Sequence, residues 1–457
     1  MKVVLISPYE IGRQPFGLAE PAAILRSRGY DVRTIDLSRE RIDPNEIRGA
    51  GLIAFYLAMH TATRIAFEAL PRLSSLAPGV HLCAYGLYAP MNEELLRRHG
   101  VNSILGGEFE PSLLEIAESL RNGQTVEDSP WQNRRVDFVV PDRTTMADLD
   151  RYAQLILADG TTKVMGFAEA SRGCKHLCRH CPIVPIYNGK FRAIPVPVVL
   201  ADIENQIRMG AEHISFGDPD FLNGPTHARK VVEALHQRFP RVTFDATIKI
   251  EHLLAHSELL RLFRDSGCLF ITSAVESVDD KILDYLQKNH TNEDFSKAVE
   301  LLREVGIDLA PTFVAFSPWT TIQGYIDLLS RLVDLRMVES VPSIQLAIRL
   351  LIPKGSYLLN IPGFASQLGD FDPETLGYPW LNRDKRVDDL QASVQLLVEQ
   401  AEGSTRKSVF KSSWRIAHEF AGSIAPELPD DLGSEIPHHS EAWYCCAEPT
   451  NQQLVSF

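Results

Sequence analysis

A chain of 457 residues and 51.1 kDa is too long for one hydrophobic core, because domains average about 150 residues. Its composition, 45% hydrophobic and 23% charged, is that of a folded globular protein and excludes a largely disordered chain. The formal net charge of −13 would repel a phosphate backbone, so we expect no nucleic acid partner.

The sequence also bears on the compartment. It holds no apolar run of about 18 residues and does not start with the pattern of a secretory signal, so we expect a cytoplasmic protein with no membrane partner. The seven cysteines are few and odd in number, which argues against a disulfide scaffold and favours reduced thiols.

Short apolar runs alternate with helical patterns over residues 1–121. The runs predict strands at residues 3–7, 32–37, 51–56, 81–86 and 103–106. Alternation with short connections is typical of a parallel sheet covered on both faces. We therefore predict an α/β, doubly wound domain at residues 1–121 and, after it, a linker at residues 122–160 that contains turn residues and little periodicity.

The alternation restarts over residues 161–358. Strands are predicted at residues 164–168, 213–217, 242–248, 270–275, 308–315 and 344–350. Strand-then-helix units of this kind predict a partial (βα)6 barrel, in which chemistry gathers at the carboxyl ends of the strands. Residues 359–457 then form a mostly helical C-terminal extension with a short tail.

Three cysteines, Cys174, Cys178 and Cys181, follow the first predicted barrel strand in the spacing C-x-x-x-C-x-x-C. Three thiolates from one loop can hold three corners of a [4Fe-4S] cluster and leave the fourth iron open for a ligand. The alternative from the residues alone is a structural zinc site completed by His176 or His180.

This spacing at the end of the first barrel strand resembles the signature of the radical S-adenosylmethionine (SAM) superfamily. The resemblance implies that the open iron binds the amino and carboxylate groups of SAM. It also implies a set of SAM-binding residues near the strand ends: His180 beside the adenine, Phe216, Gly217 and Asp218 at the methionine amino group, Glu276 at the ribose, Thr247 and Lys249 beside the third strand, and Arg349 at the methionine carboxylate.

A doubly wound domain before such a barrel resembles cobalamin-binding radical SAM proteins. Many of their N-terminal domains carry Asp-x-His-x-x-Gly after the first strand, where the histidine is the axial ligand. This chain has Pro8-Tyr9-Glu10-Ile11-Gly12-Arg13 there, without histidine. Cobalamin is therefore a candidate cofactor that we do not favour, and the domain can instead be an inherited scaffold.

The string Cys445-Cys446-Ala447-Glu448-Pro449 resembles the tail of the CUAEP/CCAEP-tail radical SAM proteins. That family includes the synthase of hydroxyarsinothricin in the arsinothricin pathway. The resemblance implies transfer of the 3-amino-3-carboxypropyl group of SAM to trivalent arsenic. Soft thiolates select thiophilic centres, so Cys445 and Cys446 are the predicted arsenic ligands.

The function predicted from the sequence is thus an aminocarboxypropyl transferase that takes arsenite and SAM and draws on an external one-electron reductant such as flavodoxin or ferredoxin. No residue decides which carbon–sulfur bond of SAM breaks, so this choice depends on the resemblance. Two alternatives remain: a cobalamin-dependent radical SAM methyltransferase and a non-enzymatic, thiol-based metalloid or zinc sensor.

Overall fold

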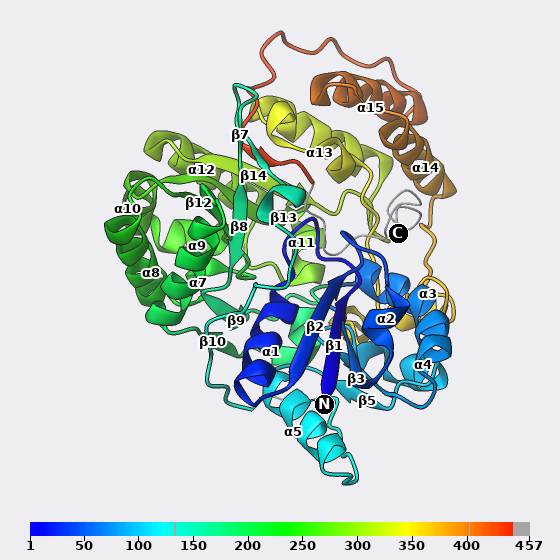
Figure 1. Ribbon diagram of the computed structural model, residues 1–457. Coiled ribbons are helices and arrows are strands. Elements are labelled where there is room, and N and C mark those ends of the chain that lie inside the picture. The colour runs from blue at the N-terminus through cyan, green and yellow to red at the C-terminus, as the bar shows by residue number, and fades with distance from the viewer. Residues whose placement is uncertain (132–133, 402, 442–457) are drawn as a thin grey trace.

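The computed structural model describes residues 1–131, 134–401 and 403–441, and the predicted arsenic ligands Cys445 and Cys446 lie outside the described residues. The described chain forms an N-terminal α/β domain, a barrel-like α/β domain beside it, and a helical extension that packs on the barrel (Figure 1). None of the described helices combines the length and the apolar character that a membrane crossing requires.

The N-terminal domain is built on a parallel sheet with the strand order β2-β1-β3-β4-β5. Its strands are β1 (Lys2–Ser7), β2 (Asp31–Asp36), β3 (Ala50–Tyr56), β4 (His81–Tyr85) and β5 (Ser103–Leu105). Its helices are α1 (Phe16–Ser27), α2 (Pro44–Ile47), α3 (His60–Leu76), α4 (Glu93–Arg98) and α5 (Glu110–Arg121). Separate apolar clusters cover the two sheet faces, which explains the continuous apolar runs. The predicted doubly wound fold is confirmed.

The second domain contains a parallel sheet with the order β14-β13-β12-β11-β8. Its strands are β8 (Met165–Ala168), β11 (His213–Phe216), β12 (Thr243–Thr247), β13 (Cys268–Glu276) and β14 (Asp308–Phe313). The helices of this domain are α6 (Ile183–Tyr187), α7 (Val196–Arg208), α8 (Pro225–Arg238), α9 (Ile250–Ala255), α10 (Leu260–Asp265), α11 (Asp280–Leu286), α12 (Asn292–Val305) and α13 (Ile322–Asp334). The predicted partial barrel is confirmed as a fold.

Local sequence explains where the barrel helices begin and end. Helix α12 starts with a capping box, in which Thr291 and Asp294 satisfy each other's backbone N–H groups. It ends at Gly306, whose φ of 81° suits glycine. Such boundaries fix the length of each helix and hence the point where the next strand enters the sheet.

The sixth barrel strand differs from the prediction at residues 344–350. Pro342 precedes a 3₁₀ turn, η6 (Ser343–Leu346), which shortens the extended segment. A single parallel bridge between Phe316 and Arg349 is the remaining strand-like contact of this segment with the sheet, among the described residues. The apolar side chains of residues 346–350 are buried without being part of a strand ladder, which explains why the pattern resembled a strand.

Two short antiparallel sheets lie outside the two parallel sheets. The pair β9 (Ser171–Gly173) and β10 (Phe191–Ala193) brackets the cysteine loop. A small sheet combines β6 (Leu155–Ile156), β7 (Thr162–Lys163) and β15 (His438–His439) in the order β15-β6-β7. The C-terminal segment therefore returns to the start of the barrel.

The predicted linker and extension both pack on the barrel. Within residues 122–160, the guanidinium of Arg143 forms a buried ion pair with Asp202 of α7 at 2.8 Å. Helices α14 (Lys385–Glu399) and α15 (Arg406–Phe420) contact each other and α13. The helical character predicted for the extension is confirmed.

Candidate active site

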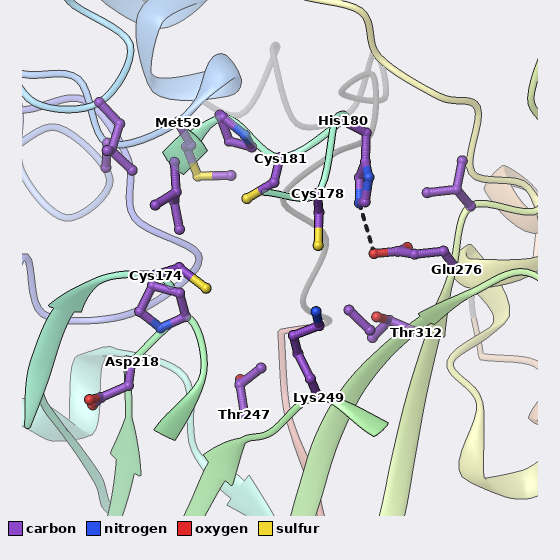
Figure 2. Close-up of a pocket in the computed structure, with 18 of the residues that line it drawn as sticks. Met59, Cys174, Cys178, His180, Cys181, Asp218, Thr247, Lys249, Glu276 and Thr312 are labelled. Carbon is purple, nitrogen blue, oxygen red and sulfur yellow. Dashed lines mark hydrogen bonds and ion pairs between the residues drawn. The ribbon is translucent and has the colours of Figure 1, made fainter. Parts of the chain in front are cut away.

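The cysteine loop begins where β9 ends. Gly173 has a φ of 73°, and a Cβ there would lie 2.4 Å from the carbonyl oxygen of Lys190, so only glycine fits this turn. Cys174, Cys178 and Cys181 then line one pocket, and their sulfur atoms face a common space (Figure 2). The sequence prediction that these three thiols converge agrees with this geometry.

The donor set fits an iron–sulfur cluster. Burial raises the pKa of the Cys174 thiol to about 11, so the thiol needs a cation or cluster to become a thiolate. A bound metal deprotonates a coordinating thiol, and three thiolates from one loop are the ligand set of a cluster with one open iron. His176 lies against Asp220 and His180 against Glu276, which weakens the alternative of a zinc site that either histidine completes together with the three thiols.

A buried charged group lies beside the cysteines. The Nε2 atom of His180 lies 3.0 Å from the carboxylate of Glu276, and the amine of Lys288 lies 3.3 Å from the same oxygen. Burial alone would raise the pKa of Glu276, but Lys288 and His180 outweigh it and lower that pKa to about 2. Glu276 is therefore an anion in the pocket wall.

The backbone at Glu276 explains how this side chain reaches the pocket. The residue ends β13 with a φ of 69°, and the pairing register with β14 shifts between Ala274 and Glu276. A bulge of this kind turns a side chain away from the regular alternation of a strand. The left-handed conformation of a non-glycine residue is typical of functional sites.

Sequence reasoning missed Lys288. Its side chain is 3% exposed and lines the pocket close to Cys178 and Cys181. Although burial opposes the charged form, Glu276 holds the pKa of Lys288 above its ordinary value. Lys288 stands between two residues with positive φ, Gln287 and Asn289, and no sequence motif marks it.

The three predicted residues Phe216, Gly217 and Asp218, at the end of β11 and just after it, all line the pocket, but each also has a packing or hydrogen-bond role. Phe216 lines the pocket but also packs on Phe221 at 4.7 Å, and a Cβ on Gly217 would lie 2.0 Å from the Phe167 ring. The carboxylate of Asp218 accepts hydrogen bonds from the Ala170 N–H and the Ser171 hydroxyl.

These contacts give Asp218 a clear task. Burial raises its pKa to about 7, and both of its oxygens hold the segment that leads into the cysteine loop. The carboxylate therefore positions the loop. Thr247 and Lys249 line the pocket at the end of β12, as expected (Figure 2). The Lys249 amine lies 2.7 Å from Glu251.

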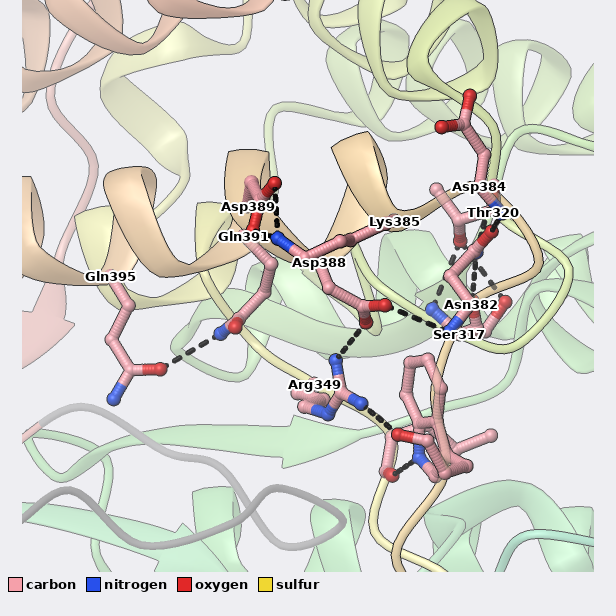
Figure 3. A network of polar contacts seen from close by, with 12 residues as sticks. Ser317, Thr320, Arg349, Asn382, Asp384, Lys385, Asp388, Asp389, Gln391 and Gln395 are labelled. Atoms are coloured by element: carbon pink, nitrogen blue, oxygen red, sulfur yellow. Dashed lines mark hydrogen bonds and ion pairs between the residues drawn. The ribbon is translucent and has the colours of Figure 1, made fainter.

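Arg349 is a correction to the sequence prediction. Its guanidinium lies 2.9 Å from Asp388 of α14, donates to the Trp380 carbonyl and stacks 3.5 Å from the Trp380 ring centroid (Figure 3). Arg349 is not among the described residues that line the pocket. The missing sixth strand explains the difference, because the side chain joins the extension to the barrel edge instead of facing the strand ends.

The N-terminal domain supplies one wall of the pocket. Its lining residues are Arg13, Ala58, Met59, Leu87 and Tyr88. A buried interdomain cluster centred on Arg172 lies behind this wall. Its guanidinium pairs with Glu169 at 2.9 Å and Glu108 at 3.5 Å, and with Glu20 and Glu110. Arg172, which directly precedes Gly173, thus joins the start of the cysteine loop to the N-terminal domain.

The described C-terminal segment ends against the same region. His439 lies 3.0 Å from Asp245 inside the barrel, and the Tyr9 hydroxyl contacts the carboxylate of Glu441. A Cβ on Gly12 would also meet Glu441 and Ala153. The last described residue therefore lies beside the loop that carries Arg13, a pocket-lining residue.

Comparison with known proteins identifies the barrel. Residues 169–318 match the family model described as the radical SAM superfamily. The anaerobic magnesium-protoporphyrin IX monomethyl ester cyclase of Rubrivivax gelatinosus is 24% identical over 336 residues, which cover 66% of this chain and 58% of that protein. The chain thus matches less than two thirds of that relative's length.

Solved structures extend the likeness to the fold. The radical SAM methyltransferase TsrM from Kitasatospora setae, with tryptophan and a SAM analogue bound, has a TM-score of 0.67 at 16% identity and covers 83% of this chain and 80% of its own. The cobalamin-dependent SAM radical enzyme OxsB with aqua-cobalamin has a TM-score of 0.69 at 16% identity, and the match covers 88% of this chain and 67% of the OxsB chain. The match of residues 169–318 to the radical SAM family model implies a [4Fe-4S] cluster and SAM as cofactors.

Proposed function

We propose that this protein is a radical SAM enzyme that transfers the 3-amino-3-carboxypropyl group of SAM to trivalent arsenic and forms hydroxyarsinothricin. The observation that carries the radical SAM part is the convergence of Cys174, Cys178 and Cys181 on one pocket. When bound, a cluster with one iron free of protein ligands supplies the electron that breaks a carbon–sulfur bond of SAM.

The residues of the chain bind and orient SAM in this proposal. Glu276 accepts hydrogen bonds from the ribose, and His180 stacks beside the adenine, while Lys288 compensates the negative charge of the cysteine loop. Thr247 and Lys249 lie across the pocket from His180. The apolar wall of Ala58, Met59, Leu87 and Tyr88 excludes water from a reactive carbon radical.

The arsenic part of the proposal depends on the sequence of the tail. Cys445 and Cys446 are soft ligands that suit trivalent arsenic, and they follow the last described residue, Glu441, within five positions. Glu441 lies next to the Tyr9–Arg13 loop at the pocket. This nearness supports a tail that presents arsenite to the site where SAM is cleaved.

The second candidate is a cobalamin-dependent methyltransferase, which the likeness to TsrM and OxsB favours. Side chains at the carboxyl end of the N-terminal sheet give the cobalamin candidate less support. Tyr56, Tyr85 and Phe109 pack against one another at its strand ends, with ring centroids 4.7–6.0 Å apart. These rings fill part of the carboxyl edge beside β3 and β4, and the loop after β1 carries no axial histidine, so we do not favour cobalamin and derive no step through it.

Product analysis tests the proposal. Anaerobic protein with a reconstituted cluster, SAM, arsenite and a reductant should give methylthioadenosine and an arsenic–carbon amino acid. Formation of 5′-deoxyadenosine with a methylated product, together with corrinoid absorbance in the purified protein, would instead support the second candidate.

A tail variant separates SAM cleavage from transfer. Cys446→Ala should cleave SAM and lose the arsenic product, because the thiol that holds the acceptor is gone. Normal product from this variant would remove the tail from the proposal. Protein that binds zinc or arsenite, yet holds no iron and sulfide after anaerobic reconstitution, would support a thiol-based sensor.

A further inference from the structure

A second group of ligand-type side chains lies just behind the pocket wall. His176 comes from the cysteine loop, Asp220 from the turn after β11, and His252 from α9. The Nε2 atom of His176 lies 3.2 Å from Asp220 Oδ2, and the Nδ1 atom of His252 lies 2.7 Å from the same oxygen. We call these three residues the carboxyl-end triad, and one ligand atom from each lies within 4.8 Å of the others.

The contacts of the carboxyl-end triad are ion pairs whose geometry does not meet that of a hydrogen bond. Within the described part of the chain, His176 Nε2, His252 Nδ1 and Asp220 Oδ2 are buried and have no hydrogen-bond partner. The Asp220 side chain is 0% exposed, so water does not reach its carboxylate. Buried polar atoms that lack a hydrogen bond cost about 1–3 kcal/mol each; the ion pairs offset part of this cost, and a cation bound by all three atoms would offset the rest.

The surroundings hold the side chains in fixed orientations. The Nδ1 atom of His176 lies 2.7 Å from Glu251, so a carboxylate supports the side of the ring opposite to Nε2. The other Asp220 oxygen, Oδ1, accepts a hydrogen bond from the Leu222 N–H at 3.2 Å. A carboxylate that orients a ligating histidine, and a backbone N–H that orients a ligating carboxylate, are typical supports of metal ligands.

We propose that His176, Asp220 and His252 bind a divalent metal ion, zinc, separate from the iron–sulfur cluster. Two imidazoles and one carboxylate are a common zinc donor set, with a fourth position for water. Tetrahedral ligands at about 2.0–2.1 Å from zinc lie about 3.3 Å from one another, so the observed separations need only small side-chain rotations.

The position of His176 gives the ion a structural task. This residue stands between Cys174 and Cys178 in sequence, whereas His252 belongs to α9 and Asp220 follows β11. A zinc ion would therefore fasten the first turn of the cysteine loop to two barrel units. Glu251 also contacts Lys249, so the same site is connected to a pocket-lining side chain.

The metal content of a cluster-free variant tests the proposal. The combined substitutions Cys174→Ala, Cys178→Ala and Cys181→Ala remove the thiols that could themselves bind zinc. After zinc exposure and dialysis against a weak chelator, elemental analysis should find about one zinc per chain. Adding His252→Gln or Asp220→Asn should weaken zinc binding by more than about 100-fold, and adding Glu251→Gln by about 10- to 100-fold.

The matched control is His439→Gln, which alters another histidine that faces an aspartate and should leave the zinc content at one equivalent. Zinc that persists in both triad variants, or a folded parent that takes up no zinc, would overturn the proposal. Another metal lost through the same substitutions would overturn zinc as the ion. If the cluster-free protein does not fold, zinc is measured beside iron in the fully reconstituted protein, whose cysteines are occupied. None of these results depends on SAM cleavage.

Discussion

Among the described residues, two histidine–aspartate–histidine groups at the barrel differ in their hydrogen bonds. In the amino-end triad, His213 of β11 and His439 of β15 both bond Asp245 of β12, through Nε2 atoms 2.9 and 3.0 Å from Oδ2. Thr243 occupies the other ring nitrogen of His213, and the Ser215 hydroxyl donates to Asp245 Oδ1. In the carboxyl-end triad, the facing atoms of His176, Asp220 and His252 make no hydrogen bond within the described residues.

The difference teaches that residue type and proximity do not by themselves identify a ligand site. Both triads bring their atoms within 4.8 Å of one another. The amino-end triad meets its own bonding needs and so ties the C-terminal segment to the barrel. The carboxyl-end triad leaves bonding capacity that a cation would use, and it lies at the end of the barrel where chemistry gathers.

The largest expected effect is the loss of SAM cleavage, with little loss of stability, when a cluster ligand at the carboxyl end of the barrel is replaced. Cys174→Ala removes one of three cluster ligands, so SAM cleavage should fall to the uncatalysed background, as measured by nucleoside release. The free energy of unfolding of the cluster-free protein should change by about 1 kcal/mol or less, because Cys174 belongs to neither of the large apolar clusters of the two domains. Residual cleavage above background would show that the cluster is held by other residues.

The amino-end triad should show the opposite pattern. Asp245→Ala leaves His213 and His439 without their buried acceptor, so the free energy of unfolding should fall by about 3 kcal/mol in urea titrations. Zinc content and SAM cleavage per cluster should stay unchanged. Ser215→Ala is the milder control, because it removes one of the bonds to Asp245. Loss of zinc from the Asp245 variant would erase the distinction between the triads.

A change at Glu276 tests the pocket itself. Glu276→Gln keeps the size of the side chain but removes the charge that faces Lys288 and the proposed ribose hydroxyls. The KM for SAM should rise about tenfold, because a hydrogen bond to a charged group contributes about 1.5–3 kcal/mol. Iron content should not change. The exposed Glu258→Gln is the control, and an unchanged KM in the Glu276 variant would remove it from the SAM site.

The smallest expected effect is a pH dependence from His213. Burial lowers its pKa below the ordinary value near 6.5, so the folded protein keeps the ring neutral while the unfolded chain takes up a proton. Its contribution to stability is present above about pH 6.5 and declines as the pH falls, by up to about 1 kcal/mol per pH unit.

Urea unfolding of Cys174→Ala protein at pH 7.5 and 5.5 measures this slope without interference from acid-labile iron–sulfur. Adding His213→Gln to that protein should reduce the difference between the two pH values. An equal difference with and without His213 would assign the pH dependence to other groups.

Much of the fold and the centre of the site could be predicted from the sequence. The apolar runs of the parallel strands mark nearly every strand, because both sheet faces are buried. The cysteine spacing marks the loop, because its three ligands are local in sequence. Thr247, Lys249 and Glu276 were predictable from their places at strand ends.

The remaining features depend on contacts between distant segments. Lys288 lies between two left-handed residues in an irregular turn, and nothing nearby in sequence pairs it with Glu276. Arg349 ends the predicted sixth strand, but Pro342 precedes a 3₁₀ turn that interrupts this strand, and the ion pair with Asp388 turns the Arg349 side chain toward the extension. His439 is 194 positions from Asp245, and such a contact leaves no periodic pattern.

The Arg172 cluster has a consequence for attempts to divide this protein into parts. A barrel cut away from the N-terminal domain would expose Glu169 and Arg172 to water, and Arg172 lies only two residues before the first cysteine. The separated N-terminal domain would retain the carboxylates of Glu20, Glu108 and Glu110 without their cation. Chimeras with a foreign N-terminal half would therefore need to carry these three acidic residues along. The two halves are better regarded as one inseparable unit for engineering than as exchangeable modules.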